Sequence, residues 1–321
     1  MDQPVRDLKA QLSQAVIGQE PLLTRMLIAL LADGHLLVEG APGLAKTRAV
    51  KALATLVEGD YRRVQFTPDL LPADLTGSDV YYPQEGAFRF HHGPLFHNLV
   101  LADEINRAPA KVQSALLEAM AERQITVGGH TYHLPELFMV MATQNPIEQE
   151  GTYPLPEAQL DRFLMHVQIT YPGREDELRI LRLARLEARN AARHVPVPPA
   201  TPVSQARILE SRSEVFALHM SEALEEYLVR VVSATRDPGP YQPDLDHWVE
   251  YGASPRATIA LDRCARAHAW LAGREYVGPE DVRAVAPDVL RHRVLLSFEA
   301  EARGMTTDRF IANLLARIPV P

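Results

Sequence analysis

Cysteine is nearly absent from the chain, and this limits both its redox and its metal chemistry. Cys264 is the only cysteine among 321 residues, which excludes an intrachain disulfide and a cysteine-based zinc site and fits a cytoplasmic location. Histidines gather in two short segments: His91, His92, His97, His130 and His133. Because no cysteine and no acidic partner at ligand spacing accompanies them, a solvated hairpin edge explains them better than a zinc site.

Long apolar runs and excess positive charge are missing as well. The longest apolar run near the N-terminus is Met26–Ala32, far shorter than the roughly 20 residues that span a bilayer, so we expect no membrane span. The opening residues MDQPVRD are acidic and contain proline where a signal peptide would be basic and then apolar, which argues against secretion. Lys and Arg number 33 against 41 Asp and Glu, and this net charge of −8 argues against a surface for duplex nucleic acid.

The patterns that are present predict an α/β protein of about two domains. Short apolar runs typical of buried strands recur in the first half: 36–38, 64–66, 99–102, 138–142 and 163–167. Helical spacing lies between them, for example at Val112, Leu116 and Ala119. This alternation predicts a three-layer αβα core with a mainly parallel sheet, which we place at residues 1–192.

A proline cluster separates this core from a second, helical half. Pro196, Pro198, Pro199 and Pro202 cannot lie inside a helix, so residues 193–204 are predicted to form a linker. From 205 to 321 the apolar spacing is helical, with breaks at 237–243 and 278–279, which predicts a small all-α domain.

The sharpest motif is GAPGLAKT, residues 40–47, between the predicted strand 36–38 and a helical stretch. A strand, a glycine-bearing turn and a helix start together present backbone N–H groups to phosphate oxygens. Lys46 would reach the β- and γ-phosphates of a nucleotide, and the Thr47 hydroxyl would bind Mg²⁺. Ala45 departs from the general pattern, in which glycine precedes the lysine.

Two acids, Asp103 and Glu104, follow the predicted strand 99–102. In an open α/β sheet, ligands bind at the carboxyl ends of strands, so both acids are expected to face the same phosphates. Asp103 would hold the Mg²⁺, and Glu104 would polarise the water that attacks the γ-phosphate. The alternative role, capping the next helix, becomes much less favourable beside a phosphate loop.

Polar residues next to two further strands follow the same logic. Asn145 comes just after the strand 138–142 and would orient the attacking water, although Asn before Pro146 is also typical of a turn. Arg162 precedes the strand 163–167 on a separate surface, which suits an arginine finger that enters a neighbouring subunit's site. A surface ion pair with Asp161 or Glu157 is the alternative.

Arg256 lies in the first turn of a predicted helix that Ser254 caps and Pro255 begins. A cation there meets the positive end of the helix dipole at a cost of roughly 0.3 to 1 kcal/mol. A nucleotide phosphate close by would offset this cost.

The order of these motifs resembles that of the MoxR family of AAA+ ATPases over nearly the whole chain. The phosphate loop, LADEINRAP, ATQNP, LPEAQLDRF and GASPRA carry the resemblance. It implies an αβα core, an all-α lid, ATP bound with Mg²⁺ between them, and a homo-oligomeric ring, usually hexameric. It also implies these roles: Walker A for Lys46 and Thr47, Walker B for Asp103 and Glu104, sensor 1 for Asn145, the arginine finger for Arg162 and sensor 2 for Arg256.

The resemblance also adds a segment that contacts the adenine. Val16-Ile17-Gly18-Gln19 resembles the family's adenine segment, which makes Ile17 and Gly18 candidate binding residues. The candidate phosphate-loop residues are Gly40, Pro42, Gly43, Leu44, Ala45, Lys46 and Thr47. Alanine at position 45 is usual in this family and does not argue against activity.

Two segments predict β-hairpins inserted in the core, at about 74–95 and 125–134. Phe88 and Phe90 alternate after Gly86 in the first, and Gly128 and Gly129 suit a tight turn in the second. The resemblance places both hairpins at the ring face or pore, where they would touch a client. Packing against a neighbouring core is an equal alternative.

The function that these motifs favour is an ATP-hydrolysing ring motor that remodels or matures a protein client. The resemblance implies chaperone-like work, often with a partner that contains a von Willebrand factor A domain. A magnesium-chelatase motor subunit is the close alternative, although LPEAQLDRF and GASPRA favour MoxR. Glu104 argues against a nucleotide-gated scaffold with little turnover, and the acidic charge argues against a nucleic-acid translocase.

Overall fold

The computed structural model describes residues 3–147, 151–193, 201–241 and 247–321. Within these residues, a five-stranded parallel sheet has the strand order β2-β5-β8-β1-β9. Its strands are β1 (Leu36–Glu39), β2 (Tyr61–Gln65), β5 (Leu99–Asp103), β8 (Met139–Gln144) and β9 (Met165–Gln168). Parallel neighbours require long crossover connections, and the intervening helices supply them.

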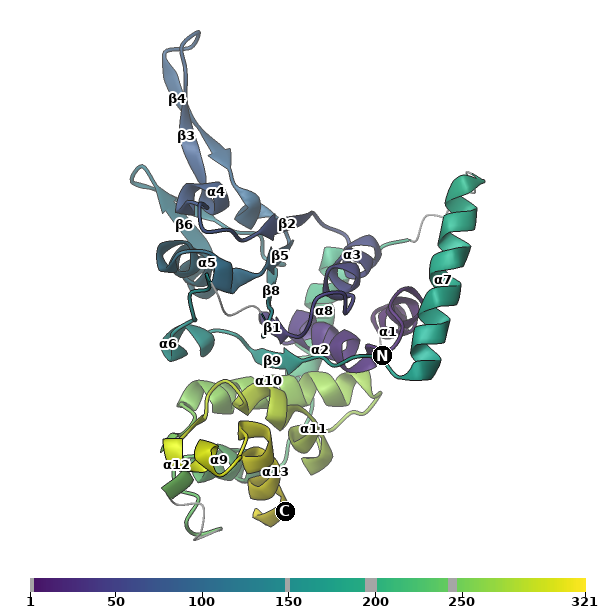
Figure 1. Cartoon of the computed structure of the whole chain (residues 1–321), viewed down its shortest axis with the longest axis vertical. Helices are drawn as coiled ribbons and strands as arrows, with labels where there is room; N and C mark the ends of the chain where they lie inside the picture. Colours follow the sequence, from purple (N-terminus) through teal and green to yellow (C-terminus); the bar gives the residue numbers. More distant parts are fainter. Residues whose placement is uncertain (1–2, 148–150, 194–200, 242–246) are drawn as a thin grey trace.

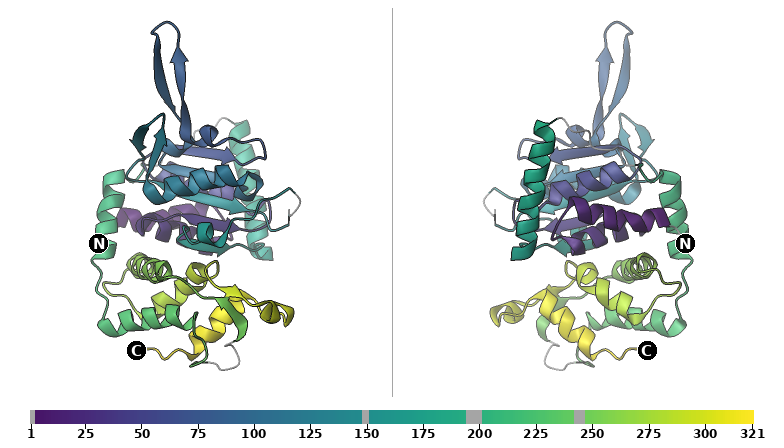
Figure 2. Two further views of the ribbon diagram at one scale, coloured as in Figure 1. Left: turned by 90° about the vertical axis from the view of Figure 1, so that its left-hand side faces the viewer. Right: turned by 90° about the vertical axis from the view of Figure 1, so that its right-hand side faces the viewer.

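Helices cover both faces of this sheet (Figure 1, Figure 2). α1 (Gln3–Ala15), α2 (Glu20–Leu31) and α3 (Lys46–Leu56) pack on one face, and α5 (Ala110–Glu122) packs on the other. Successive strand residues point to opposite faces, so Leu36 and Val38 join the first layer while Leu37 joins the second. The result is the three-layer α/β core that the sequence predicts.

The C-terminal half is mainly helical. Its helices are α8 (Gln205–Phe216), α9 (Glu222–Ala234), α10 (Pro255–Leu271), α11 (Pro279–Leu290), α12 (Phe298–Ala302) and α13 (Thr307–Arg317). A short antiparallel ribbon of β10 (Val249–Tyr251) and β11 (Leu295–Leu296) adds strands to the half that was predicted to be all helical. Residues 194–200 of the predicted linker lie outside the described residues, so that boundary stays a prediction.

A buried ion pair fixes the helical half against the sheet. The Arg293 side chain is 3% exposed, and its Nε donates to Asp161 Oδ1 at 2.7 Å while its Nη2 donates to the Phe163 carbonyl at 2.6 Å. Burial lowers the pKa of Arg293, and the Asp161 carboxylate opposes this effect. A second pair joins Arg25 of α2 to Asp288 of α11 at 2.6 Å. α10 packs on α2 and α11 on β9.

One helix and two hairpins project from this frame (Figure 1). α7 (Arg174–Ala192) stands at one edge of the molecule. The hairpins, which follow α4 (Pro72–Thr76) and α5 in the chain, pair β3 (Gly77–Tyr82) with β4 (Ala87–His92) and β6 (Gln124–Val127) with β7 (His130–His133). Phe90 stacks on Tyr132 with ring centroids 4.1 Å apart, so the two hairpins contact each other. In the described part of the chain, no helix is both long and apolar enough to cross a membrane.

Candidate active site

Residues 40–45 form the turn that joins β1 to α3, and the motif ends with the first two residues of α3, Lys46 and Thr47. A Cβ on Gly40 would lie 2.4 Å from Ile169 Cγ1, so only glycine fits there. Gly43 and Ala45 adopt φ angles of +83° and +62°, a region that glycine enters freely and alanine rarely. The turn ends at the start of α3, where free backbone N–H groups and the helix dipole favour an anion.

Lys46 is the first residue of α3, and its side chain reaches back to the start of the turn. Its Nζ donates to the Gly40 carbonyl at 2.6 Å and to the Gln144 carbonyl at 3.4 Å. Burial lowers the pKa of Lys46, while the Asp103 and Glu104 carboxylates oppose this lowering. A phosphate would favour the charged ammonium in the same way.

A cleft of about 350 Å³ opens at the carboxyl ends of β5 and β8, beside the turn. The residues that line it are Pro42, Gly43, Leu44, Ala45, Lys46, Thr47, Arg48, Asp103, Glu104 and Asn145. The fold therefore brings the candidate phosphate, metal and water-positioning residues together. Asn145 Oδ1 also accepts from the Ile147 N–H at 3.1 Å, so the same side chain stabilises the turn around Pro146.

Side chains from neighbouring strands hydrogen-bond to the two acids, Asp103 and Glu104. The sequence motifs did not predict these contacts. Asp103 accepts a hydrogen bond from Thr143 Oγ1 at 2.6 Å and from Arg63 Nη2 at 2.7 Å. Glu104 accepts from Gln65 Nε2 at 2.7 Å and has a φ of +58°, a strained conformation common at functional sites. The strand order explains these contacts, because β2 and β8 flank β5 on its two sides. If the strand order had been predicted from the sequence, these contacts to Asp103 and Glu104 could have been predicted as well.

The donor set of the cleft fits Mg²⁺. Hydroxyl and carboxylate oxygens are the ligands that Mg²⁺ prefers, and Thr47 and Asp103 supply them on the same cleft. Arg63 pairs with Asp103 Oδ2, while Oδ1 accepts one hydrogen bond from Thr143. Oδ1 therefore keeps a lone pair that can bind the metal while the ion pair stays in place.

A smaller cleft of about 110 Å³ adjoins the first and suits a nucleotide base. The two clefts share Gly43, Leu44, Ala45 and Arg48, and the further walls are Ala15, Val16, Ile17, Gln19, Pro172, Ile180, Leu183 and Ala184. Gly18 is not among the residues that line this cleft, and a Cβ on it would lie 2.9 Å from Pro172 Cβ. The mainly apolar lining suits a flat ring. Sequence reasoning missed the contribution of α7 to this cleft. Arg48 Nη1 of α3 donates a hydrogen bond to Glu187 Oε2 of α7 at 3.1 Å, which joins the two helices.

Arg162 and Arg256 lie in a third cleft, of about 260 Å³, which Asp33, Arg123 and Arg263 also line. Arg162 Nη1 donates to the Leu117 carbonyl at 2.7 Å. Arg256 Nη1 is 3.8 Å from Asp161 Oδ2, while Asp161 pairs closely with Arg293 rather than with Arg162. Neither Arg162 nor Arg256 is among the described residues that line the first cleft, which contains Lys46 and which we call the phosphate cleft.

Known proteins are similar to this chain in both sequence and fold. Residues 35–165 match the model of the ATPase family associated with various cellular activities (AAA), and residues 246–314 match the AAA lid domain. "Chaperone MoxR1" of Mycobacterium tuberculosis is 45% identical over 97% of this chain and 81% of its own length. The chain belongs to the MoxR family of AAA+ ATPases. Other relatives of this MoxR-family chain include "Protein MoxR" of Paracoccus denitrificans, 35% identical over 98% of the chain and 96% of that protein.

A solved structure confirms the fold of the MoxR-family chain. The crystal structure of a candidate ATPase from Cytophaga hutchinsonii covers 99% of this chain and 95% of its own, with a TM-score of 0.91 and 45% identity. A chloroplast magnesium-chelatase subunit of Arabidopsis thaliana is more distant, 28% identical over 65% of this chain and 47% of its own length. The predicted α/β core with a lid is therefore confirmed.

Proposed function

We propose that this chain hydrolyses ATP in a cytoplasmic hexameric ring of identical subunits and thereby remodels a protein client.

ATP is the substrate and Mg²⁺ the metal that this function requires. The observation that carries the proposal is the division of the candidate residues between two clefts. Lys46 and Glu104 line the phosphate cleft, whereas Arg162 lines another. Such a site is complete only when the arginine of one copy meets the phosphate cleft of the next.

In this proposal each group has one task. Lys46 neutralises charge on the phosphates, Glu104 polarises the attacking water and Asn145 orients it. Mg²⁺ held by Thr47 and Asp103 would offset further phosphate charge. Two arginines of the neighbouring copy then stabilise the charge that develops at the γ-phosphate: Arg162 and Arg256. Gln65 and Arg107 both contact Glu104 Oε2, and these contacts restrict how far the carboxylate can turn toward the water.

The exposed hairpin of β3 and β4 is the candidate client surface. Tyr81 and Phe88 are 51% and 70% exposed, with ring centroids 5.1 Å apart. Exposed aromatic pairs mark surfaces that bind other proteins. Because Phe90 stacks on Tyr132, a movement of one hairpin is transmitted to the other. A protein with a von Willebrand factor A domain is a candidate partner in this work.

The relatives support a MoxR-type role over a chelatase role. "Chaperone MoxR1" matches 97% of this chain, while the magnesium-chelatase subunit matches 65% of it at lower identity. A chelatase motor subunit would also act on a tetrapyrrole with two partner subunits. We therefore propose the chaperone-like function.

The test is ATP turnover per protomer across a wide range of protein concentration. The wild-type rate should rise with concentration, because assembly completes each site. Arg162→Ala should bind ATP normally and lose about 10³-fold or more of its rate, as expected for an arginine finger. Arg317→Ala, at an exposed position of α13, is the matched control and should retain the wild-type rate. A wild-type rate that is independent of concentration and unchanged in Arg162→Ala would refute the proposal.

A further inference from the structure

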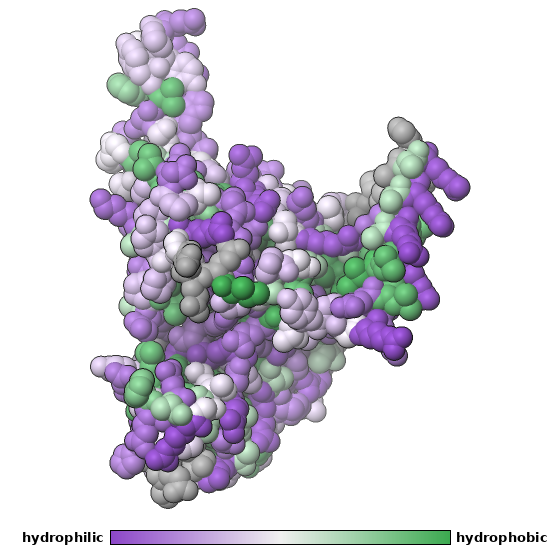
Figure 3. All heavy atoms as spheres, viewed as in Figure 1, coloured by the Kyte–Doolittle hydropathy of each residue, from purple (hydrophilic) through white to green (hydrophobic). Residues whose placement is uncertain are grey.

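The outer side of α7 carries a stripe of arginines and leucines. The inner side of the helix, which includes Ile180 and Leu183, lines the smaller cleft of about 110 Å³, which we call the base cleft. At about 100° per residue, the opposite side presents six residues that we call the arginine–leucine stripe. They are Leu178, Leu181, Arg182, Arg185, Leu186 and Arg189, and all six are exposed. Figure 3 shows apolar and hydrophilic side chains together on the exposed surface of α7.

Among the described residues, the arginines of the arginine–leucine stripe have no ion-pair partner. In the part of the chain that the structure describes, no carboxylate forms an ion pair with the three arginines of the stripe, whereas Arg179 pairs with Asp176 at 2.8 Å. Leu178, Leu181 and Leu186 are 47%, 46% and 54% exposed. Leucines gathered on one exposed helix face are typical of a surface that another protein covers.

A cleft of complementary character lies between α6 (Glu157–Leu160) and β10. It has a volume of about 620 Å³, and we call it the acidic cleft. Glu157 and Glu250 line it and are exposed, and no described cation forms an ion pair with either. Tyr251, which is 65% exposed, and Leu295 supply apolar surface beside the two carboxylates. The acidic cleft thus offers both the charge and the apolar contact that the stripe requires.

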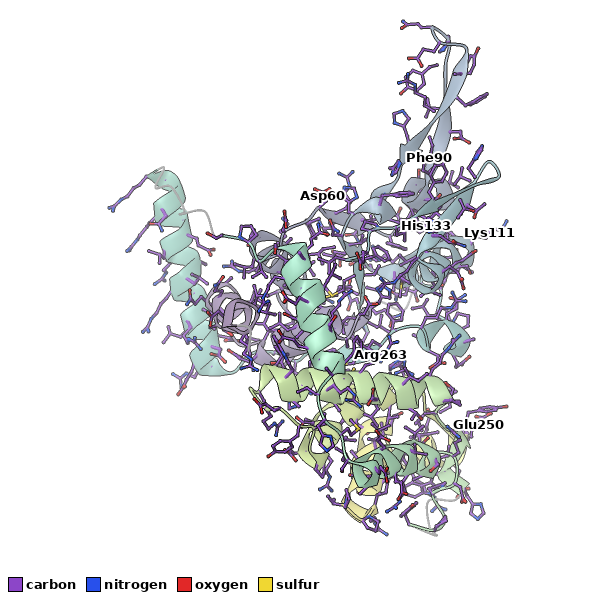
Figure 4. The ribbon with its side chains drawn as sticks, turned by 180° about the vertical axis from the view of Figure 1, so that it is seen from behind. Asp60, Phe90, Lys111, His133, Glu250 and Arg263 are labelled. Carbon is purple, nitrogen blue, oxygen red and sulfur yellow. The ribbon has the colours of Figure 1, made fainter. Side chains whose placement is uncertain are left out.

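The two surfaces lie at opposite edges of the molecule. Figure 4 shows Glu250 at one edge and α7 at the other, and Figure 1 shows α6 and α7 on opposite sides of the molecule. One copy therefore cannot bring its own stripe to its own cleft. Contact between unlike surfaces on opposite edges joins copies head to tail, and such contacts form a ring when the rotation between successive copies closes.

We propose that the arginine–leucine stripe of α7 docks into the acidic cleft of the next copy in the ring. The proposal rests on the proposed function, because the acidic cleft and the Arg162 cleft share Asp161 and so lie on the same side of the chain. Arginines of the stripe face Glu157 and Glu250, and its leucines pack near Tyr251. Since the inner side of α7 lines the base cleft, the same helix contacts both the nucleotide and the neighbouring copy.

Cross-linking between two single-site variants tests this contact directly. Arg185→Cys and Tyr251→Cys, one of them tagged, are mixed with ATP and a short bismaleimide. The native Cys264 is fully buried, and burial raises the pKa of its thiol, so it does not compete. A cross-linked dimer should form in the mixture and not in either variant alone. Arg317→Cys mixed with Tyr251→Cys is the control. Equal cross-linking in that control would overturn the proposal.

Charge reversal gives a second, independent test. Reversal of the stripe with Arg182→Glu and Arg185→Glu should raise the concentration needed for assembly about tenfold. Reversal of the cleft with Glu157→Arg and Glu250→Arg should do the same. All four substitutions in one chain should restore assembly, because every copy then carries both reversed surfaces.

The outcomes separate this proposal from the proposed function. If Arg162→Ala suppresses turnover while stripe reversal changes neither assembly nor cross-linking, the ring ATPase stands and the α7 contact fails. If the cross-link forms while turnover is independent of concentration, the contact stands and catalysis between subunits fails. Stripe reversal that leaves the ring intact but abolishes binding of another protein also overturns the α7 contact.

Discussion

Removal of the Asp161 charge should destabilise the junction between sheet and lid. Arg293 is almost fully buried against this carboxylate, and Ser254 Oγ donates to its other oxygen at 3.0 Å. Asp161→Asn keeps the shape of the side chain and removes its charge. The buried guanidinium then retains only neutral acceptors, among them the Phe163 and Leu164 carbonyls.

The size of the effect follows from this geometry. Removing one partner of a buried ion pair costs about 3–5 kcal/mol. Asp161 is 18% exposed and the carbonyl acceptors remain, so we expect a loss of about 2–3 kcal/mol. At about 2–4 °C per kcal/mol, the midpoint of thermal unfolding should fall by roughly 5–10 °C. Because Arg162 is the next residue, ATP turnover should fall as well.

Thermal unfolding followed by circular dichroism measures this loss. Glu299→Gln is the matched control, because Glu299 and its partner Arg303 are 58% and 62% exposed, and such a pair contributes less than about 0.5 kcal/mol. In an Arg293→Met background, Asp161→Asn should cost under about 1 kcal/mol, since no buried cation remains. The reasoning is wrong if Asp161→Asn is as stable as the control, or if it costs the same in both backgrounds.

Further changes test the phosphate cleft and a buried histidine. Lys46→Ala should abolish ATP binding, while Glu104→Gln should bind ATP without turnover; a fluorescent nucleotide and phosphate release measure the two. Gln65→Leu should raise the basal rate about two- to tenfold, because it removes one hydrogen bond that holds Glu104, and an unchanged rate would contradict this. Burial lowers the pKa of His35 to about 4, so the neutral form stabilises the fold. About 3 kcal/mol should be lost as the pH falls from about 6.5 to 4, because the unfolded state then binds the extra proton. His35→Gln should lack this loss in urea unfolding, and parallel pH profiles would count against the assignment.

The sequence by itself predicted the elements and the local chemistry of the cleft. Strand and helix patterns arise from residues close together in the chain, which is why the αβα core and the GAPGLAKT turn were predicted from spacing. Asp103 and Glu104 follow from the rule that ligands bind at the carboxyl ends of parallel strands. The same logic placed Asn145 at the cleft, where the structure has it.

Only the tertiary structure decided which distant residues share a cleft. Gln65 reaches Glu104 because β2 pairs with β5, and no local pattern specifies that pairing. α7 closes the base cleft, and Arg293 meets Asp161 across 132 residues of sequence. Arg162 and Arg256 line one cleft together with Asp161 and Arg293, away from Lys46. Such contacts depend on strand order and on how the two halves pack, which are properties of the whole chain.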